Sequence, residues 1–185
     1  GRIYPLAPNH TYEETYEIVE KLYSHLLEMD KPIIIMGDSA GGGLSAAFCE
    51  YLAVNDMPEP KNLILISPWV DMSMSGNYDE VEYDPMLGVD GAREMGKAWA
   101  GDLDTKDYRV SPLFGEVSKL PKTTTFIGTH EIIYPDVVEF HEKLTDAGVD
   151  AELVVGEEMS HVYPLYPMVP EAKEAFNYIV EILLE

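Results

Sequence analysis

The feature that most constrains the fold is an apolar run at residues 33–36 (Ile-Ile-Ile-Met), followed at once by Gly-Asp-Ser-Ala-Gly at residues 37–41. Continuously apolar residues predict a buried strand of a parallel sheet. The small residues after the run have helical spacing, so a sharp turn must join the strand to a helix. This arrangement holds the hydroxyl of Ser39 clear of the sheet and directs the helix N-terminus at it. The sequence therefore predicts that Ser39 is a nucleophile.

The rest of the chain alternates strand patterns with helix patterns. Strands are predicted at residues 33–36, 62–67, 123–128 and 151–155. Helices are predicted from a Thr-x-x-Glu capping box at residues 11–14, after Ser39, near residues 91–99, from 135 to 148, and from about 170. In the last helix the pattern places Phe176, Ile179, Val180 and Leu183 inward. Such alternation predicts one α/β domain over residues 1–185, with a parallel sheet covered by helices on both faces.

A nucleophilic serine needs a base, and the base needs a carboxylate to orient it. Glu131 follows the third predicted strand and His161 follows the fourth, at the carboxyl ends where α/β sheets place their ligands. Asp136 is a second candidate acid, although the helix dipole already explains an acidic residue in a first turn. The segment at residues 84–87 is interpreted as a turn. The remaining histidines are interpreted as surface, packing or structural residues: His10, His25, His130 and His141.

Several segments, taken together and in order, resemble the hormone-sensitive-lipase-type carboxylesterases of the α/β-hydrolase superfamily. The matching segments are residues 4–10, 37–42, 67–71, 84–87, 111–114, 128–131 and 159–162. The resemblance implies that Ser39 is the nucleophile, His161 the general base and Glu131 the acid. Many members of the family have Asp-Pro-Leu where this chain has Glu-Ile-Ile at residues 131–133, which keeps Asp136 as a rival acid.

The resemblance also implies a function. A member of this family hydrolyses small neutral acyl esters through an acyl-enzyme, without a cofactor, and the backbone N–H of Ala40 contributes to its oxyanion hole. Asp38, Trp69 and Met72 are candidate residues of the substrate pocket. Two alternatives remain open: an amide or N-acyl hydrolase, and a non-catalytic module that binds small molecules on the same fold.

The start of the chain carries a further expectation. In the family, a His-Gly-Gly-Gly-type oxyanion loop precedes the segment matched by residues 4–10, and this chain begins three residues before that segment. We therefore expect an N-terminally incomplete catalytic domain that lacks the first strands and this loop, and that is a poor esterase alone. A strand as apolar as residues 33–36 needs a neighbour on each edge. Residues 1–6, an upstream segment or a second copy in a homo-oligomer would provide it.

Composition excludes several classes of function. The net charge is −22, from 34 acidic and 12 basic residues, which argues against binding to nucleic acid or to an anionic membrane. No apolar stretch has the length of a membrane span, and the histidines show no metal-binding spacing. The single Cys49 cannot form an internal disulfide, which favours a reducing, cytoplasmic compartment.

Overall fold

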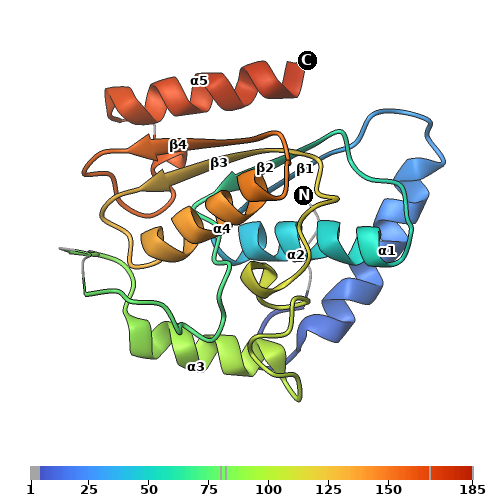
Figure 1. The fold of residues 1–185 in the computed structure, drawn as a ribbon, viewed down its shortest axis with the longest axis horizontal. Helices are drawn as coiled ribbons and strands as arrows, with labels where there is room; N and C mark the ends of the chain where they lie inside the picture. The colour runs from blue at the N-terminus through green and yellow to red at the C-terminus, as the bar shows by residue number, and fades with distance from the viewer. Residues whose placement is uncertain (1–4, 80, 82, 167, 185) are drawn as a thin grey trace.

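The computed structural model of the chain describes residues 5–79, 81, 83–166 and 168–184. Four parallel strands form one sheet in the order β1-β2-β3-β4: β1 (Ile34–Asp38), β2 (Asn62–Ile66), β3 (Lys122–Gly128) and β4 (Ala151–Gly156). Five α-helices accompany them within these ranges: α1 (Tyr12–Leu27), α2 (Ala40–Val54), α3 (Val89–Ala100), α4 (Tyr134–Asp146) and α5 (Pro170–Leu184) (Figure 1). All four predicted strands and all five predicted helices are confirmed.

Helices cover both faces of the sheet, as the alternating pattern predicts. On one face, Cys49 of α2 and Phe140 of α4 pack with Leu63 and Leu65 of β2. On the opposite face, residues of α5 pack against the other side chains of β2 and against β3. Figure 1 shows α5 alone above the sheet and α2 and α4 below it. The chain therefore has the predicted α/β fold with a parallel sheet.

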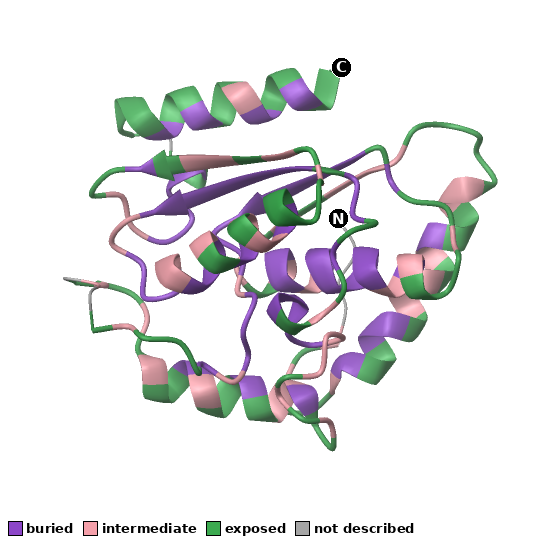
Figure 2. Ribbon diagram, in the orientation of Figure 1, coloured by how far each residue is buried: buried purple, intermediate pink, exposed green. Residues whose placement is uncertain are grey.

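The two central strands are the most buried part of the sheet. Every residue of β2 is buried, and β3 is buried throughout except for Lys122 (Figure 2). The first strand is less buried than its continuously apolar sequence predicts. In the described part of the chain β1 pairs only with β2, and the side chain of Met36 is 49% exposed. Most of the predicted partner segment, residues 1–6, lies outside the described residues.

A third cluster joins α1 and α3 to the outer side of α2. Tyr16 and Tyr23 of α1 pack edge-to-face against Phe48 of α2, and Ala100 at the end of α3 belongs to the same cluster. The first helix begins at Tyr12 as predicted, but the predicted capping box does not form, because the side chain of Thr11 makes no cap hydrogen bond. Packing of aromatic rings along α1, and not a side-chain cap at Thr11, therefore holds this helix in place.

The face of α5 that packs on the sheet differs from the predicted one. Its buried residues are Ala172, Ala175, Ile179 and Ile182. Of the four residues predicted to point inward, only Ile179 does so, because Phe176, Val180 and Leu183 are 45%, 36% and 43% exposed. Two adjacent stripes of the helix are apolar, and the prediction chose the stripe with the larger side chains. The two alanines allow the helix to approach the sheet closely, so the smaller stripe is buried.

Candidate active site

The turn between β1 and α2 places Ser39 in a strained backbone conformation. Its φ is 53° and its ψ is −123°, values that residues other than glycine rarely adopt. Hydrogen bonds hold the peptide groups on both sides of the residue. The N–H of Ser39 donates to the carbonyl of Ile66 (2.9 Å), while its carbonyl accepts the N–H groups of Trp69 (3.0 Å) and Gly43 (3.1 Å). The predicted sharp turn is therefore present and is fixed by its neighbours.

Two glycines allow this turn to form. A Cβ atom on Gly37 would lie 2.2 Å from the carbonyl oxygen of Gly41, and a Cβ on Gly43 would lie 2.0 Å from the carbonyl oxygen of Trp69. Both obstacles are backbone atoms that cannot move aside without displacing the turn. Gly37 and Gly43 are thus required by the close packing of strand, helix and loop.

The structure brings Ser39, His161 and Glu131 into one hydrogen-bonded chain. The Nε2 atom of His161 lies 2.8 Å from Oγ of Ser39, and its Nδ1 atom lies 2.7 Å from Oε2 of Glu131. His161 is 5% exposed and Glu131 is fully buried. Because an ionised carboxylate can only accept, Nδ1 carries the imidazole proton and Nε2 is left to accept the serine proton. The arrangement can therefore activate Ser39 as a nucleophile.

Two further donors hold the carboxylate of Glu131. Its Oε1 atom accepts the hydroxyl of Ser67 (2.8 Å) and the backbone N–H of Gly128 (2.6 Å). With the imidazole on Oε2, three donors surround this buried group, which compensates the cost of removing a charge from water. Nearby, burial and the negative charge of Glu131 raise the pKa of Tyr163 to about 12, so its phenol stays neutral.

The rival acid, Asp136, is turned to another partner. It lies in the first turn of α4 and is 1% exposed, and its Oδ2 atom accepts the hydroxyl of Tyr78 (2.9 Å). The pKa of Asp136 is raised to about 7. Burial is the main cause and the charges of Asp71 and Glu139 act in the same direction, whereas the hydrogen bond from Tyr78 lowers the pKa. The sequence interpretation explained Asp136 by the helix dipole. The dipole accounts neither for the burial of this carboxylate nor for its hydrogen bond with Tyr78.

The segment at residues 84–87 is a turn, as predicted, and it also contacts the residue that follows Glu131. The Oδ1 atom of Asp84 accepts the backbone N–H groups of Met86 (2.8 Å) and Leu87 (2.9 Å), which closes the turn. Its Oδ2 atom accepts the N–H of Ile132 at 2.8 Å. The turn is therefore attached to the residue that follows Glu131.

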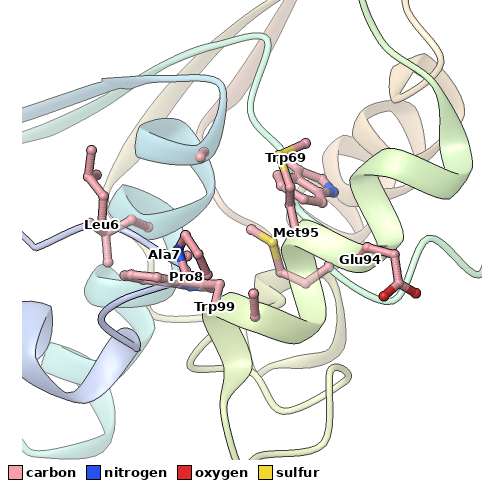
Figure 3. A pocket seen from close by; sticks show the side chains of 11 residues that line it. Leu6, Ala7, Pro8, Trp69, Glu94, Met95 and Trp99 are labelled. Atoms are coloured by element: carbon pink, nitrogen blue, oxygen red, sulfur yellow. The ribbon is translucent and has the colours of Figure 1, made fainter.

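A cavity of about 550 Å³ adjoins the turn that carries Ser39. Its lining residues are Leu6, Ala7, Pro8, Ala40, Leu44, Trp69, Met72, Glu94, Met95, Ala98 and Trp99 (Figure 3). The lining is almost entirely apolar, since the carboxylate of Glu94 pairs with Lys97 (2.7 Å) and points away from the other labelled side chains. The structure places the predicted pocket residues Trp69 and Met72 in this lining, together with Ala40. Asp38 is exposed beside Ser39 and lies outside the lining.

Within the described ranges, no cluster of three or more His, Cys, Asp or Glu side chains could hold a metal ion. The same part of the chain contains no helix with the length and apolar character needed to cross a membrane. Cys49 is buried on α2 as a free thiol, and burial raises its pKa far above the usual value. This thiol is therefore unsuited to nucleophilic chemistry.

Sequence reasoning gave no role to Ser67 or Tyr78. Ser67 is fully buried at the end of β2 and contacts Glu131, and Tyr78 covers Asp136 from an irregular loop. The position of Ser67, at the end of a predicted strand, is a signal that could have found it, since the three other strands end near Ser39, Glu131 and His161. Nothing in the sequence around Tyr78 marks its contact with a residue 58 positions away.

Comparison with known proteins agrees with this architecture. The sequence matches the family described as alpha/beta hydrolase fold over residues 3–165. The chain belongs to this family. The alpha/beta hydrolase fold and the strand–turn–helix at Ser39, both expected from the sequence, are thus supported by the geometry and by the family match.

Individual relatives are similar to this alpha/beta hydrolase over nearly its whole length. An esterase of Acinetobacter venetianus is 33% identical over 188 residues, which cover 96% of this chain and 61% of that protein. The crystal structure of a putative esterase from Staphylococcus aureus is 29% identical with a TM-score of 0.91, covering 99% of this chain and 63% of that one. A hormone-sensitive lipase from a metagenome library is 31% identical with a TM-score of 0.86, covering 97% and 62%. The resemblance to hormone-sensitive-lipase-type enzymes is confirmed, and the chain spans roughly three fifths of the length of these relatives.

Proposed function

We propose that this alpha/beta hydrolase is a serine carboxylic-ester hydrolase in which Ser39, His161 and Glu131 form the catalytic triad. The observation that carries the proposal is the continuous chain from Oγ of Ser39 through both ring nitrogens to the carboxylate, with distances of 2.8 and 2.7 Å. The names of the relatives, an esterase, a putative esterase and a hormone-sensitive lipase, support the same chemistry.

In the proposed mechanism, Oγ of Ser39 attacks the ester carbonyl while its proton passes to Nε2 of His161. The imidazolium keeps its Nδ1–H on Glu131, whose negative charge stabilises it. The N–H of Ala40, at the start of α2, donates to the oxygen that becomes negative. His161 then returns the proton to the leaving alkoxide, and an acyl group remains on Ser39. Water, deprotonated by His161, attacks this acyl-enzyme, and the imidazolium returns the proton to Oγ of Ser39 as the bond to the acyl group breaks and the acid is released.

The cavity supports a neutral, apolar acyl or alcohol group as the substrate part that it binds. Its volume of about 550 Å³ lies within the range of small-molecule sites, roughly 300–1,000 Å³. Trp69, Met95 and Trp99 offer apolar contacts, and a net charge of −22 disfavours anionic substrates. Small neutral acyl esters are therefore the proposed substrate class.

The test is turnover of p-nitrophenyl acetate by matched alanine variants of the complete enzyme. Ser39→Ala and His161→Ala should each reduce kcat by about 10⁴-fold or more, and the double variant should lose little beyond that, because the residues act as a unit. The exposed pair Ser24→Ala and His25→Ala on α1 serves as the control and should leave kcat unchanged. A fluorophosphonate should label Ser39. Turnover by Ser39→Ala comparable to that of the unmodified protein would refute the proposal.

Labelling also separates the reaction from simple binding. A non-catalytic module on the same fold would bind an ester without forming a covalent adduct on Ser39. Parallel assays with p-nitrophenyl acetate and p-nitroacetanilide, which share the acetyl group, compare ester and amide cleavage. A higher kcat/KM for the anilide would move the assignment to an amide hydrolase.

A further inference from the structure

One side-chain atom of Ser67 contacts both the loop of the proposed acid and the loop of the proposed base. It follows β2 directly and is fully buried. Its Oγ atom lies 2.8 Å from Oε1 of Glu131 and 2.9 Å from the backbone nitrogen of Val162, the residue after His161. A single hydroxyl thus joins the segments that follow β3 and β4.

The direction of these two hydrogen bonds follows from the chemistry of the partners. The N–H of Val162 can only donate, so the oxygen of Ser67 must accept from it. The proton of the hydroxyl is then available to Oε1 of Glu131, which can only accept while it is ionised. Donation therefore runs from the backbone N–H beside the base, through Ser67, to the carboxylate, which also accepts the Nδ1–H of the imidazole on its other oxygen. The bond from Val162 polarises the hydroxyl of Ser67 and so strengthens the bond that this hydroxyl donates to Glu131.

The backbone around this hydroxyl is held in an uncommon conformation. Ser67 has a φ of 47°, and Val162 has a φ of 55°, in the left-handed region that β-branched residues rarely adopt. The N–H of Ser67 donates to the carbonyl of Phe126 of β3 at 2.7 Å, which fixes the residue. Strained residues of this kind persist where the surrounding structure determines them, and they concentrate at functional sites.

We propose that Ser67 is a positioning residue of the proposed hydrolysis reaction, and this inference rests on the proposed function. Its hydroxyl holds Oε1 of Glu131, so that the other oxygen stays aligned with Nδ1 of His161. It also fixes the backbone that carries the imidazole. When the imidazole takes the serine proton, the carboxylate must already be in line with it. Ser67 contacts neither Ser39 nor the cavity, so it acts through Glu131 and leaves substrate binding alone.

The first experiment compares two substitutions that both remove the hydroxyl. Ser67→Ala keeps the strained backbone, whereas Ser67→Gly relieves it, because glycine adopts positive φ readily. Both variants should lower kcat for p-nitrophenyl acetate about 10- to 100-fold, the range for losing a hydrogen bond to a charged group, with KM nearly unchanged. The glycine variant should unfold at a higher temperature than the alanine variant. If kcat instead recovers with stability in the glycine variant, Ser67 has only a structural role.

A double-mutant cycle with Glu131→Gln tests whether Ser67 acts through the carboxylate. Once Glu131→Gln has removed the charge, adding Ser67→Ala should lower kcat less than about threefold further. Full additivity of the two losses would overturn the inference. Thr123→Val is the control, because it removes another buried hydroxyl, bonded to the carbonyl of Pro121 at the opposite end of β3. It should lower the unfolding temperature without changing kcat.

The same set of variants distinguishes a failure of the proposed function from a failure of the role proposed for Ser67. If Ser39→Ala is as active as the unmodified protein, the proposed function is wrong and the role of Ser67 falls with it. If Ser39→Ala is inactive while Ser67→Ala and Ser67→Gly keep full kcat, the proposed function stands and only the role of Ser67 is refuted.

Discussion

Replacing Asp136 by asparagine should make the protein more stable at neutral and alkaline pH. The carboxyl is 1% exposed, accepts the hydroxyl of Tyr78 and has a pKa raised to about 7, mainly by burial. Asparagine has the same shape and keeps a carbonyl oxygen for Tyr78, but it never acquires a charge. The substitution therefore removes the cost of ionising a buried group and preserves the contact.

The sign and size of the effect follow from linkage between protonation and folding. In the unfolded chain the carboxyl titrates near pH 3.9, whereas in the folded protein it titrates near pH 7. Between these values the folded state binds one more proton than the unfolded state, so the stability contributed by Asp136 falls as the pH rises. The loss is complete above the folded pKa. A difference of about 3 pKa units corresponds to about 4 kcal/mol as an upper bound.

Urea unfolding of the two proteins at pH 4, 5, 6, 7 and 8, followed by tryptophan fluorescence, measures the effect. The free energy of unfolding of Asp136→Asn minus that of the unmodified protein should grow from pH 4 to pH 7 and then level off. Asp146→Asn, at the exposed end of the same helix, is the control and should give a nearly constant difference. A difference for Asp136→Asn that does not change with pH would refute the argument. Turnover by this variant should stay near that of the unmodified protein, since Asp136 contacts Tyr78 and not His161.

Two further predictions test the packing. Ile179→Ala, on the buried stripe of α5, should lower the free energy of unfolding by about 2–5 kcal/mol. Phe176→Ala, on the exposed stripe, should lower it by about 1 kcal/mol or less. Equal losses would mean that α5 packs on the sheet through another face. Gly43→Ala should lower the free energy of unfolding by about 1–3 kcal/mol and also lower kcat, because its methyl group would press on the carbonyl of Trp69. Gly91→Ala on α3, where an added Cβ meets open space, should be neutral or stabilising. Thermal unfolding and activity assays measure both effects, and a Gly91→Ala variant less stable than Gly43→Ala would contradict the argument.

The sequence predicts the order of strands and helices well, because the period of apolar residues is a local signal. The run at residues 33–36 and the glycines around Ser39 leave few alternatives to a strand, a sharp turn and a helix. The spacing also places Glu131 and His161 after their strands, and the structure brings both to Ser39. Their roles in the reaction remain predictions.

What the sequence does not predict depends on contacts between distant segments. The buried stripe of α5 is missed because Ala172 and Ala175 have weak apolar signals, although close packing against the sheet favours them. The capping box at Thr11 is a frequent local pattern, but its side-chain hydrogen bond is absent here. The burial of Asp136 under Tyr78 follows from a loop that no periodic pattern describes.

The backbone bonds of Ser39 have a consequence for how substrate range can change. The carbonyl of Ser39 accepts the N–H of Trp69, so a backbone hydrogen bond joins Ser39 directly to a residue that lines the cavity. Substitutions that reshape the loop at Trp69 will therefore alter turnover together with substrate preference. Met95 and Trp99 belong to α3, a separate helix that lines the same cavity. New specificities should accumulate on α3, where selection can vary the fit of the substrate without changing the hydrogen bond between Ser39 and Trp69.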